Sequence, residues 1–297
     1  MEETALSVRR LNKSFGRKQA LHNVNFDCRP GHIVGLIGAN GAGKTTIMKA
    51  ILSLIKSQGD ITINGQASTF NHHAALADVG ALIEYPGIYP FLSGRDHLKL
   101  FARPTADKAQ RIQMVIQELH LEPYIDRRLK GYSLGMRQKM GIALALVNQP
   151  RLVILDEPMN GLDPQATKDL RELIKKKQVQ GTTFLISSHI LGELQKLAED
   201  LIVIDHGRVV HQTTMQELLA RNQHFLVLTT DQDLRAAGIL AENGYLVTAH
   251  APIRVQLRAA DTVAAVLKTL TSHGVSIEDV QHEDGDFEQS ILDMLRE

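Results

Sequence analysis

The sequence predicts an α/β protein built on a parallel sheet and followed by a second, smaller α+β domain. A glycine-rich loop at residues 38–45 lies between an apolar run of strand length and a run with helical spacing. Two further apolar runs, 152–155 and 183–186, are separated by a polar helix at about 164–178, a β-α-β rhythm typical of parallel sheets. After Gly207 short strands and helices follow one another in a different order.

Alternating apolar and polar residues predict the first strands. This alternation runs from Leu6 to Arg29 and is interrupted by a turn at residues 15–18. Residues 60–65 and 78–83 have the length and composition of two more short strands. We therefore expect a pair of strands before the glycine-rich loop and two further strands after it.

The loop itself matches the phosphate-binding pattern G-x-x-x-x-G-K-[ST] at every required position. Its glycines let successive backbone N–H groups face one anion, and the N-terminus of the next helix adds partial positive charge. Lys44 is expected to reach the β- and γ-phosphates, and the Thr45 hydroxyl to bind Mg²⁺. The expected nucleotide-binding residues here are Asn40, Gly41, Ala42, Gly43, Lys44, Thr45 and Thr46. The alternative is a glycine-rich turn that binds nothing.

From about Tyr89 to Asn148 apolar residues recur at helical spacing. Within this region Ser133 and Gly135 precede a helix expected at 139–147. Ser133 can cap that helix, and the free N–H groups at its start could receive an anion. Taken alone, this feature favours an ordinary capped helix.

The apolar runs 152–155 and 183–186 both lead into side chains that suit phosphate chemistry. The first delivers Asp156, which could bind Mg²⁺ beside Thr45, and then Glu157, which could polarise an attacking water. The second leads to His189, which could hydrogen-bond a γ-phosphate. The alternatives are a helix N-cap with a surface neighbour for the acidic pair, and a surface or structural role for His189.

The last part of the chain has the order β-α-β-β-α-β, which predicts a ferredoxin-like domain. We place the boundary near residues 216–221 and therefore expect domains at 1–215 and 216–297. The expected strands are 225–228, 245–248, 253–257 and 275–280, and the expected helices are 234–240, 262–270 and 287–295.

Composition gives few constraints beyond these patterns. Lys plus Arg equals Asp plus Glu at 33 each, so no global charge favours nucleic acid or an acidic membrane. Cys28 is the only cysteine of the 297 residues, which excludes an intramolecular disulfide and a zinc cluster and fits a reducing cytosol. No apolar run approaches the ~20 residues that cross a bilayer, and no secretory signal is visible. A membrane process would therefore need a separate membrane chain.

Taken together, the order and spacing of these motifs resemble the ATP-binding cassette (ABC) ATPases over about residues 6–212, roughly two-thirds of the chain. The resemblance implies a P-loop nucleotide-binding domain with a helical subdomain at about 88–150, and ATP with Mg²⁺ as cofactors. It implies that Phe15, where the family usually has Tyr, stacks on adenine. It also implies that Ser133 and Gly135 close on the ATP of a partner subunit, that Asp163 couples the two sites, and that His189 is a switch histidine.

Two departures from the family pattern stand out. The signature L-S-G-G-Q is replaced by residues 132–136, in which Leu134 takes the place of a glycine and Met136 that of a glutamine. In addition, Glu84 takes the place of a glutamine in a loop that meets the membrane partner, where it is also expected to contribute to the Mg²⁺ site. A Glu in this loop resembles the ATPases of bacitracin- and lantibiotic-resistance exporters. The alternative is a drifted Gln with an unchanged role.

The resemblance thus predicts an ATP-hydrolysing exporter subunit with Glu157, His189 and Lys44 as catalytic residues. Its expected partners are an integral-membrane permease and a second copy of itself or a related ATPase, which would place it on the cytoplasmic face of the membrane. The alternatives are the ATPase of an importer or another exporter, an ATP sensor without hydrolysis, and a soluble ATPase acting on nucleic acid or ribosomes. No nucleic-acid partner is expected, because the chain has one cassette and no basic footprint.

Overall fold

The structure, a computed structural model, describes residues 4–221, 224–258 and 261–284. The chain divides into two units, Met1–Met215 and Gln216–Glu297. Each unit encloses a hydrophobic cluster of its own, so each can be described by itself.

A parallel sheet lies at the centre of the first unit and confirms the predicted α/β class. Its strand order is β10-β9-β3-β8-β7-β6, and only the edge strand β10 runs antiparallel to its neighbour. Every residue of β3, β7 and β8 is buried, which explains their largely apolar sequences. The strands are β3 (Ile33–Ile37), β6 (Val79–Leu82), β7 (Leu152–Asp156), β8 (Thr183–Ser188), β9 (Asp200–Asp205) and β10 (Arg208–Thr214).

A second, antiparallel sheet has the order β2-β1-β4-β5. It contains β1 (Leu6–Phe15), β2 (Lys18–Cys28), β4 (Gln58–Ile63) and β5 (Gln66–Ala67), which confirms the predicted turn between the first two strands. Helix α1 (Lys44–Ile51) shares one core with both sheets, formed in part by Phe26, Ile47 and Leu185. Cys28 is buried in this core, and burial raises the pKa of its thiol. It therefore behaves as a small core residue.

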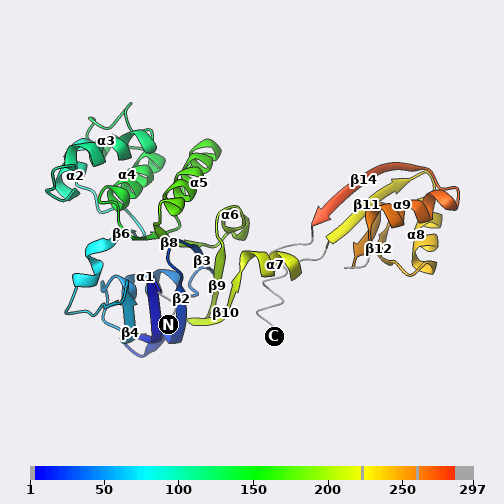
Figure 1. Ribbon diagram of the computed structural model, residues 1–297, viewed down its shortest axis with the longest axis horizontal. Helices are drawn as coiled ribbons and strands as arrows, with labels where there is room; N and C mark the ends of the chain where they lie inside the picture. The colour runs from blue at the N-terminus through cyan, green and yellow to red at the C-terminus, as the bar shows by residue number, and fades with distance from the viewer. Residues whose placement is uncertain (1–3, 222–223, 259–260, 285–297) are drawn as a thin grey trace. The chain divides into compact units, whose positions relative to one another are not determined.

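Three helices, α2, α3 and α4, lie between β6 and β7 in the sequence and contact one another (Figure 1). They confirm the helical spacing, although α4 begins at Leu134 and not at the expected residue 139. The helices of this unit are α2 (Gly94–Phe101), α3 (Lys108–Glu118), α4 (Leu134–Leu146), α5 (Pro164–Val179) and α6 (Leu191–Gln195), with two 3₁₀ turns at Ala74–Asp78 and Leu129–Gly131. Helix α5 matches the predicted polar helix.

The second unit begins with α7 (Met215–Arg221) near the boundary and contains a four-stranded antiparallel sheet. The sheet order, β12-β13-β11-β14, is that of a ferredoxin-like fold, and the predicted β-α-β-β-α-β order is confirmed. The predicted helix at 287–295 lies outside the described residues. The elements are β11 (His224–Thr230), α8 (Asp233–Glu242), β12 (Leu246–His250), β13 (Ile253–Leu257), α9 (Val263–Ser272) and β14 (Ile277–Asp284).

Candidate active site

The glycine-rich loop joins the central strand β3 to the N-terminus of α1, as predicted. Gly43 takes the position before the first helical residue with φ 114°, a conformation that L side chains rarely adopt. At Gly38 an added Cβ would come within 2.3 Å of the carbonyl oxygen of Ile204, so only glycine fits beside the neighbouring strand. These two positions fix the loop against the sheet with the start of the helix directed into it.

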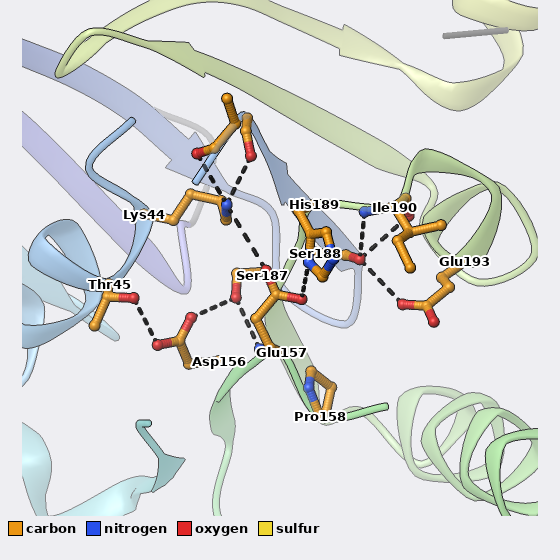
Figure 2. Close-up of polar contacts among 12 residues, drawn as sticks. Lys44, Thr45, Asp156, Glu157, Pro158, Ser187, Ser188, His189, Ile190 and Glu193 are labelled. Carbon is orange, nitrogen blue, oxygen red and sulfur yellow. Dashed lines mark hydrogen bonds and ion pairs between the residues drawn. The ribbon is translucent and has the colours of Figure 1, made fainter. Parts of the chain in front are cut away.

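Lys44 bridges the loop. Its Nζ donates hydrogen bonds to the carbonyl oxygens of Gly38, at 2.6 Å, and Ala39, at 3.3 Å. The same ammonium lies 3.7 Å from Oε1 of Glu157, and its side chain is only 6% exposed (Figure 2). The cation is therefore held between the loop and the acidic end of β7.

Asp156, at the end of β7, accepts hydrogen bonds on both carboxylate oxygens. Thr45 Oγ1 donates to Oδ2 at 2.7 Å, and Ser187 Oγ donates to Oδ1 at 2.6 Å (Figure 2). A threonine hydroxyl and a carboxylate are hard oxygen ligands of the kind that Mg²⁺ prefers, and few protein ligands suffice when phosphate oxygens complete the shell. Among the described residues no group of three or more His, Cys, Asp or Glu forms another metal site.

Glu157 follows directly, and its carboxylate has a different partner. Its Oε2 lies 2.9 Å from Nδ1 of His189, and its backbone N–H donates to Ser187 Oγ at 2.9 Å. Asp156 and Ser187 are register partners in the neighbouring parallel strands β7 and β8, which explains why Glu157 and His189 meet. Glu157 also has φ 49°, an unusual value for a non-glycine residue. A carboxylate, an imidazole and an ammonium thus converge beside the phosphate-binding loop.

Ser133 caps α4 as expected, since its Oγ accepts a hydrogen bond from the N–H of Met136 at 3.3 Å. Asp163 caps α5 in the same way, accepting from Ala166 N at 2.8 Å. An open depression of about 390 Å³ lies here, lined by residues that include Ser133, Gly135, Gly161 and Asp163. The first turn of α4 therefore borders this open space.

Comparison with known proteins agrees with this geometry. Residues 21–160 match the ABC transporter family. The lantibiotic transport ATP-binding protein SrtF of Streptococcus pyogenes is 39% identical over 69% of this chain and 89% of its own length. The bacitracin transport ATP-binding protein BcrA of Enterococcus faecalis is 34% identical over 83% of this chain and 80% of its own. This chain belongs to the ABC transporter family.

A solved structure described as the ATP-binding subunit of an ABC transporter superposes with a TM-score of 0.66 at 30% identity. It covers 73% of this chain, and 93% of its own length is covered. The chain is thus an ATP-binding subunit of an ABC transporter, from a family of ATPases.

Two other residues expected in this ABC ATPase site contact lysine side chains in this structure. The Phe15 ring is 52% exposed, with Lys13 Nζ 4.5 Å from its centroid. Glu84 has φ 58°, and its Oε1 lies 2.7 Å from Lys49 Nζ on α1. A contribution of Glu84 to the Mg²⁺ site would require this ion pair to open.

The structure adds two residues that the sequence did not reveal as functional. Ser187 connects the backbone of Glu157 with the carboxylate of Asp156. Gln138 of α4 donates to the carbonyl oxygens of Glu157 and Pro158. A polar residue at the end of an apolar strand was a signal for Ser187, but nothing in the local sequence identifies the acceptors of Gln138.

Proposed function

We propose that this chain is the ATPase subunit of an exporter for antimicrobial peptides, and that it works as an ATP-closed pair of nucleotide-binding domains. The convergence of Lys44, Glu157 and His189 at the phosphate-binding loop is the observation that carries the hydrolytic part. The substrate class rests on the lantibiotic and bacitracin relatives, and on Glu84 in the loop that follows β6. Residues 1–215 would form the ATPase domain, with the helical subdomain at about 88–150, and residues 216–297 the accessory domain.

The loop amides of residues 40–46 would receive the phosphates. Lys44 would exchange its bonds to the carbonyls of Gly38 and Ala39 for the β- and γ-phosphate oxygens, and Phe15 would stack on adenine. Thr45 and Asp156, with a contribution from Glu84, would hold Mg²⁺. The ion neutralises developing charge on the phosphate oxygens.

Glu157 would act as the general base. It accepts a proton from the attacking water as the oxygen–phosphorus bond forms and the bond to the β-phosphate oxygen breaks. His189, next to it, would fix the carboxylate and hydrogen-bond the γ-phosphate. Ser133 and Gly135 of a second protomer would close on the same γ-phosphate, so that ATP, and not ADP, stabilises the closed pair. Asp163 would couple the two sites.

The permease would bind the helical part of the first unit. An open groove of about 750 Å³ is lined there by residues that include Leu54, Leu82, Tyr85 and Phe101. Tyr85 is 82% exposed and Phe91 65%, which is unusual for aromatic side chains that contact only water. No helix among the described residues has both the length and the hydropathy to cross a bilayer. The chain would therefore be held at the cytoplasmic face of the membrane through this partner.

The first prediction tests the catalytic assignment. Glu157→Gln keeps the shape of the side chain but removes the base, so MgATP should still bind and should now trap a stable dimer, while turnover falls about 10³-fold or more. Light scattering with and without MgATP measures the dimer, and phosphate release measures turnover. Lys44→Ala is the control, because it should abolish both binding and dimerisation. Parental turnover by Glu157→Gln, or tight ATP binding by Lys44→Ala, would refute the assignment.

The substrate class needs a separate experiment. Together with its membrane subunit in inside-out vesicles, the parental chain should concentrate a labelled peptide antibiotic in the lumen when MgATP is added outside. The Glu157→Gln variant should give no accumulation. ATP-driven accumulation of another solute class, with none of the peptide, would retain the ATPase and reject the substrate.

A further inference from the structure

The helix that carries the signature residues also touches the backbone of the catalytic glutamate. Gln138 lies in α4, one helical turn beyond Ser133 and Gly135, and is only 6% exposed. Its Nε2 donates to the carbonyl oxygen of Glu157 at 3.2 Å and to that of Pro158 at 3.1 Å. A glutamine amide has two N–H donors, so both are used on this one turn of backbone.

This turn is one that needs support. Glu157 has φ 49°, and a non-glycine residue in that region is strained and persists only when its surroundings hold it there. Ser187 Oγ holds the N–H of Glu157, while Gln138 and the N–H of Asn160 hold its carbonyl oxygen, the latter at 3.1 Å. Of these three, only Gln138 comes from outside the strand ends and the turn itself.

The hydrogen bonds of Gln138 link residues that belong to two different nucleotide sites in the proposed dimer. Ser133 and Gly135 at the start of α4 would contact ATP held by the partner's loop, whereas Glu157 would act on ATP held by its own loop. At the same end of α4, an added Cβ on Gly135 would meet the carbonyl oxygen of Gly161 at 2.9 Å, so the helix start fits closely against the loop that follows Glu157. A displacement of the first turn of α4 would therefore reach the catalytic turn.

We propose that Gln138 is a positioning residue that sets the Glu157 carboxylate according to the state of the signature helix. Closure of Ser133 on one nucleotide would thereby prepare the base for hydrolysis of the other. This inference rests on the proposed function, because it assigns Gln138 a part in that same reaction. Gln138 contacts no reacting atom, and it acts through the backbone of Glu157.

A positioning role predicts a loss of kcat without a loss of nucleotide affinity. Gln138→Met keeps the length and approximate volume of the side chain but removes both donors. We expect kcat to fall at least about 10-fold, since small displacements of a catalytic group have large effects on rate, while the Kd for MgATP changes less than about 3-fold. Gln178→Met is the matched control. Gln178 donates to the carbonyl oxygen of Gly31 at 2.6 Å, remote from Glu157, and its removal should leave kcat within about 2-fold.

Gln138→Glu adds a second measurement, the pH dependence of kcat, which a purely structural role would leave unchanged. An ionised carboxylate between two carbonyl oxygens repels both, whereas the protonated form can donate to one of them. Burial beside these oxygens raises the pKa of the introduced carboxyl. The ratio of variant kcat to parental kcat should therefore rise as the pH falls from about 8.5 to 6.5. The ratio is followed in one preparation, so it holds even if only part of the protein folds.

Different outcomes would refute the positioning role of Gln138 and the proposed function. Parental kcat in Gln138→Met, equal losses of kcat and ATP affinity, or a pH-independent ratio for Gln138→Glu would each overturn the positioning role. A parental protein that neither hydrolyses ATP nor forms the Glu157→Gln dimer would instead refute the proposed function. The Glu157→Gln, Gln138→Met double variant should still dimerise at the same MgATP concentration, because binding does not depend on the position of the base. Loss of that dimer would also overturn the inference.

Discussion

Asp156 and Glu157 are consecutive residues, yet their carboxylates have different contacts. Asp156 is 4% exposed and accepts two hydroxyl hydrogen bonds, from Thr45 and Ser187, which leaves lone pairs for a metal. Glu157 is more exposed, and its carboxylate contacts ionisable groups, His189 and Lys44. A left-handed residue after the strand turns the second carboxylate toward the loop. The backbone at this one residue therefore separates the proposed metal ligand from the proposed base.

Ser187 contacts the carboxylate of Asp156 and the backbone N–H of Glu157, so its removal tests this arrangement. Ser187→Ala leaves a partly buried N–H of Glu157 and one oxygen of Asp156 without the serine. The free energy of unfolding should fall by about 1–3 kcal/mol. The Mg²⁺ concentration that gives half-maximal ATPase should rise, and kcat should fall about 10-fold, both measured by phosphate release. Ser53→Ala, which breaks a buried 3.2 Å contact with Ser68, is the control. Equal kinetics for the two variants would contradict a role for Ser187 in the site.

The role of a residue could be predicted where it lies in a local sequence motif. It could not be predicted where it depends on a partner far away in the sequence. Local sequence patterns predict a role in phosphate chemistry for Lys44, Thr45, Asp156 and Glu157. The acceptors of Gln138 lie 19 and 20 positions away, across a strand and its turn, so only the fold brings them together. The ion pair of Glu84 with Lys49 likewise spans 35 positions.

At the scale of elements, helix α2 fixes the segment before it through a histidine. His97 is fully buried, and its Nε2 accepts a hydrogen bond from the N–H of Tyr89 at 2.8 Å. Its Nδ1 lies 3.4 Å from the carbonyl oxygen of Ser93, and the ring stacks on Phe101. A proton on Nε2 would face a donor, so this packing requires the neutral imidazole. Burial lowers the pKa of His97 below its ordinary value of 6.5, although Ser93 and Asp96 oppose this.

This lowered pKa predicts how stability depends on pH. Above pH 6.5 His97 is neutral in both states, and its contribution is fully present. Below 6.5 the unfolded chain binds a proton that the folded state does not, so this contribution is lost as the pH falls toward the folded pKa. Urea unfolding between pH 7.5 and 5.5 should show a larger loss for the parent than for His97→Gln. His72→Gln, at an exposed histidine, should behave like the parent. Identical slopes for the parent and His97→Gln would contradict this origin of the pH dependence.

Element boundaries were predicted best where local sequence signals mark them. The turn at residues 15–18 and helix α5 agree with the sequence pattern, because strong turn and capping residues mark them. Helix α4 begins five residues earlier than expected, since its first turn borders open space and carries no apolar period. Strands β9 and β10 were not predicted. The apolar run of β9 follows the short helix α6, where nothing separates a strand from a buried helix by periodicity alone.

At the scale of the whole molecule, the fold class of each unit could be predicted from the sequence. The order of the strands in the larger sheet could not. Apolar runs alternating with a helix predict a parallel sheet. They do not predict that β3, from the start of the chain, lies between β8 and β9. In the second unit the β-α-β-β-α-β order leaves few topologies, and the observed sheet is the expected one. Crossover connections thus limited the prediction in the larger unit.

A ligand that binds only one of the two units should allow their thermal unfolding transitions to be distinguished. The second unit has a core of its own, with Leu226, Leu240, Ile253 and Leu270 fully buried. MgATP at about 100 times its Kd would stabilise the first unit by about 2.7 kcal/mol, which for a domain of that size raises Tm by about 5–10 °C. Calorimetry of the parental chain should therefore show two transitions, of which nucleotide moves one.

Leu240→Ala assigns the other transition. It removes a fully buried side chain from the second unit and should destabilise that unit by about 2–5 kcal/mol. The transition that ignores MgATP should then fall in temperature, while the nucleotide-dependent one stays where it was. Because the ligand and the substitution act on different cores, each is the control for the other. A single transition that responds to both would show that the two units unfold as one cooperative body, and the C-terminal unit would then report directly on nucleotide binding.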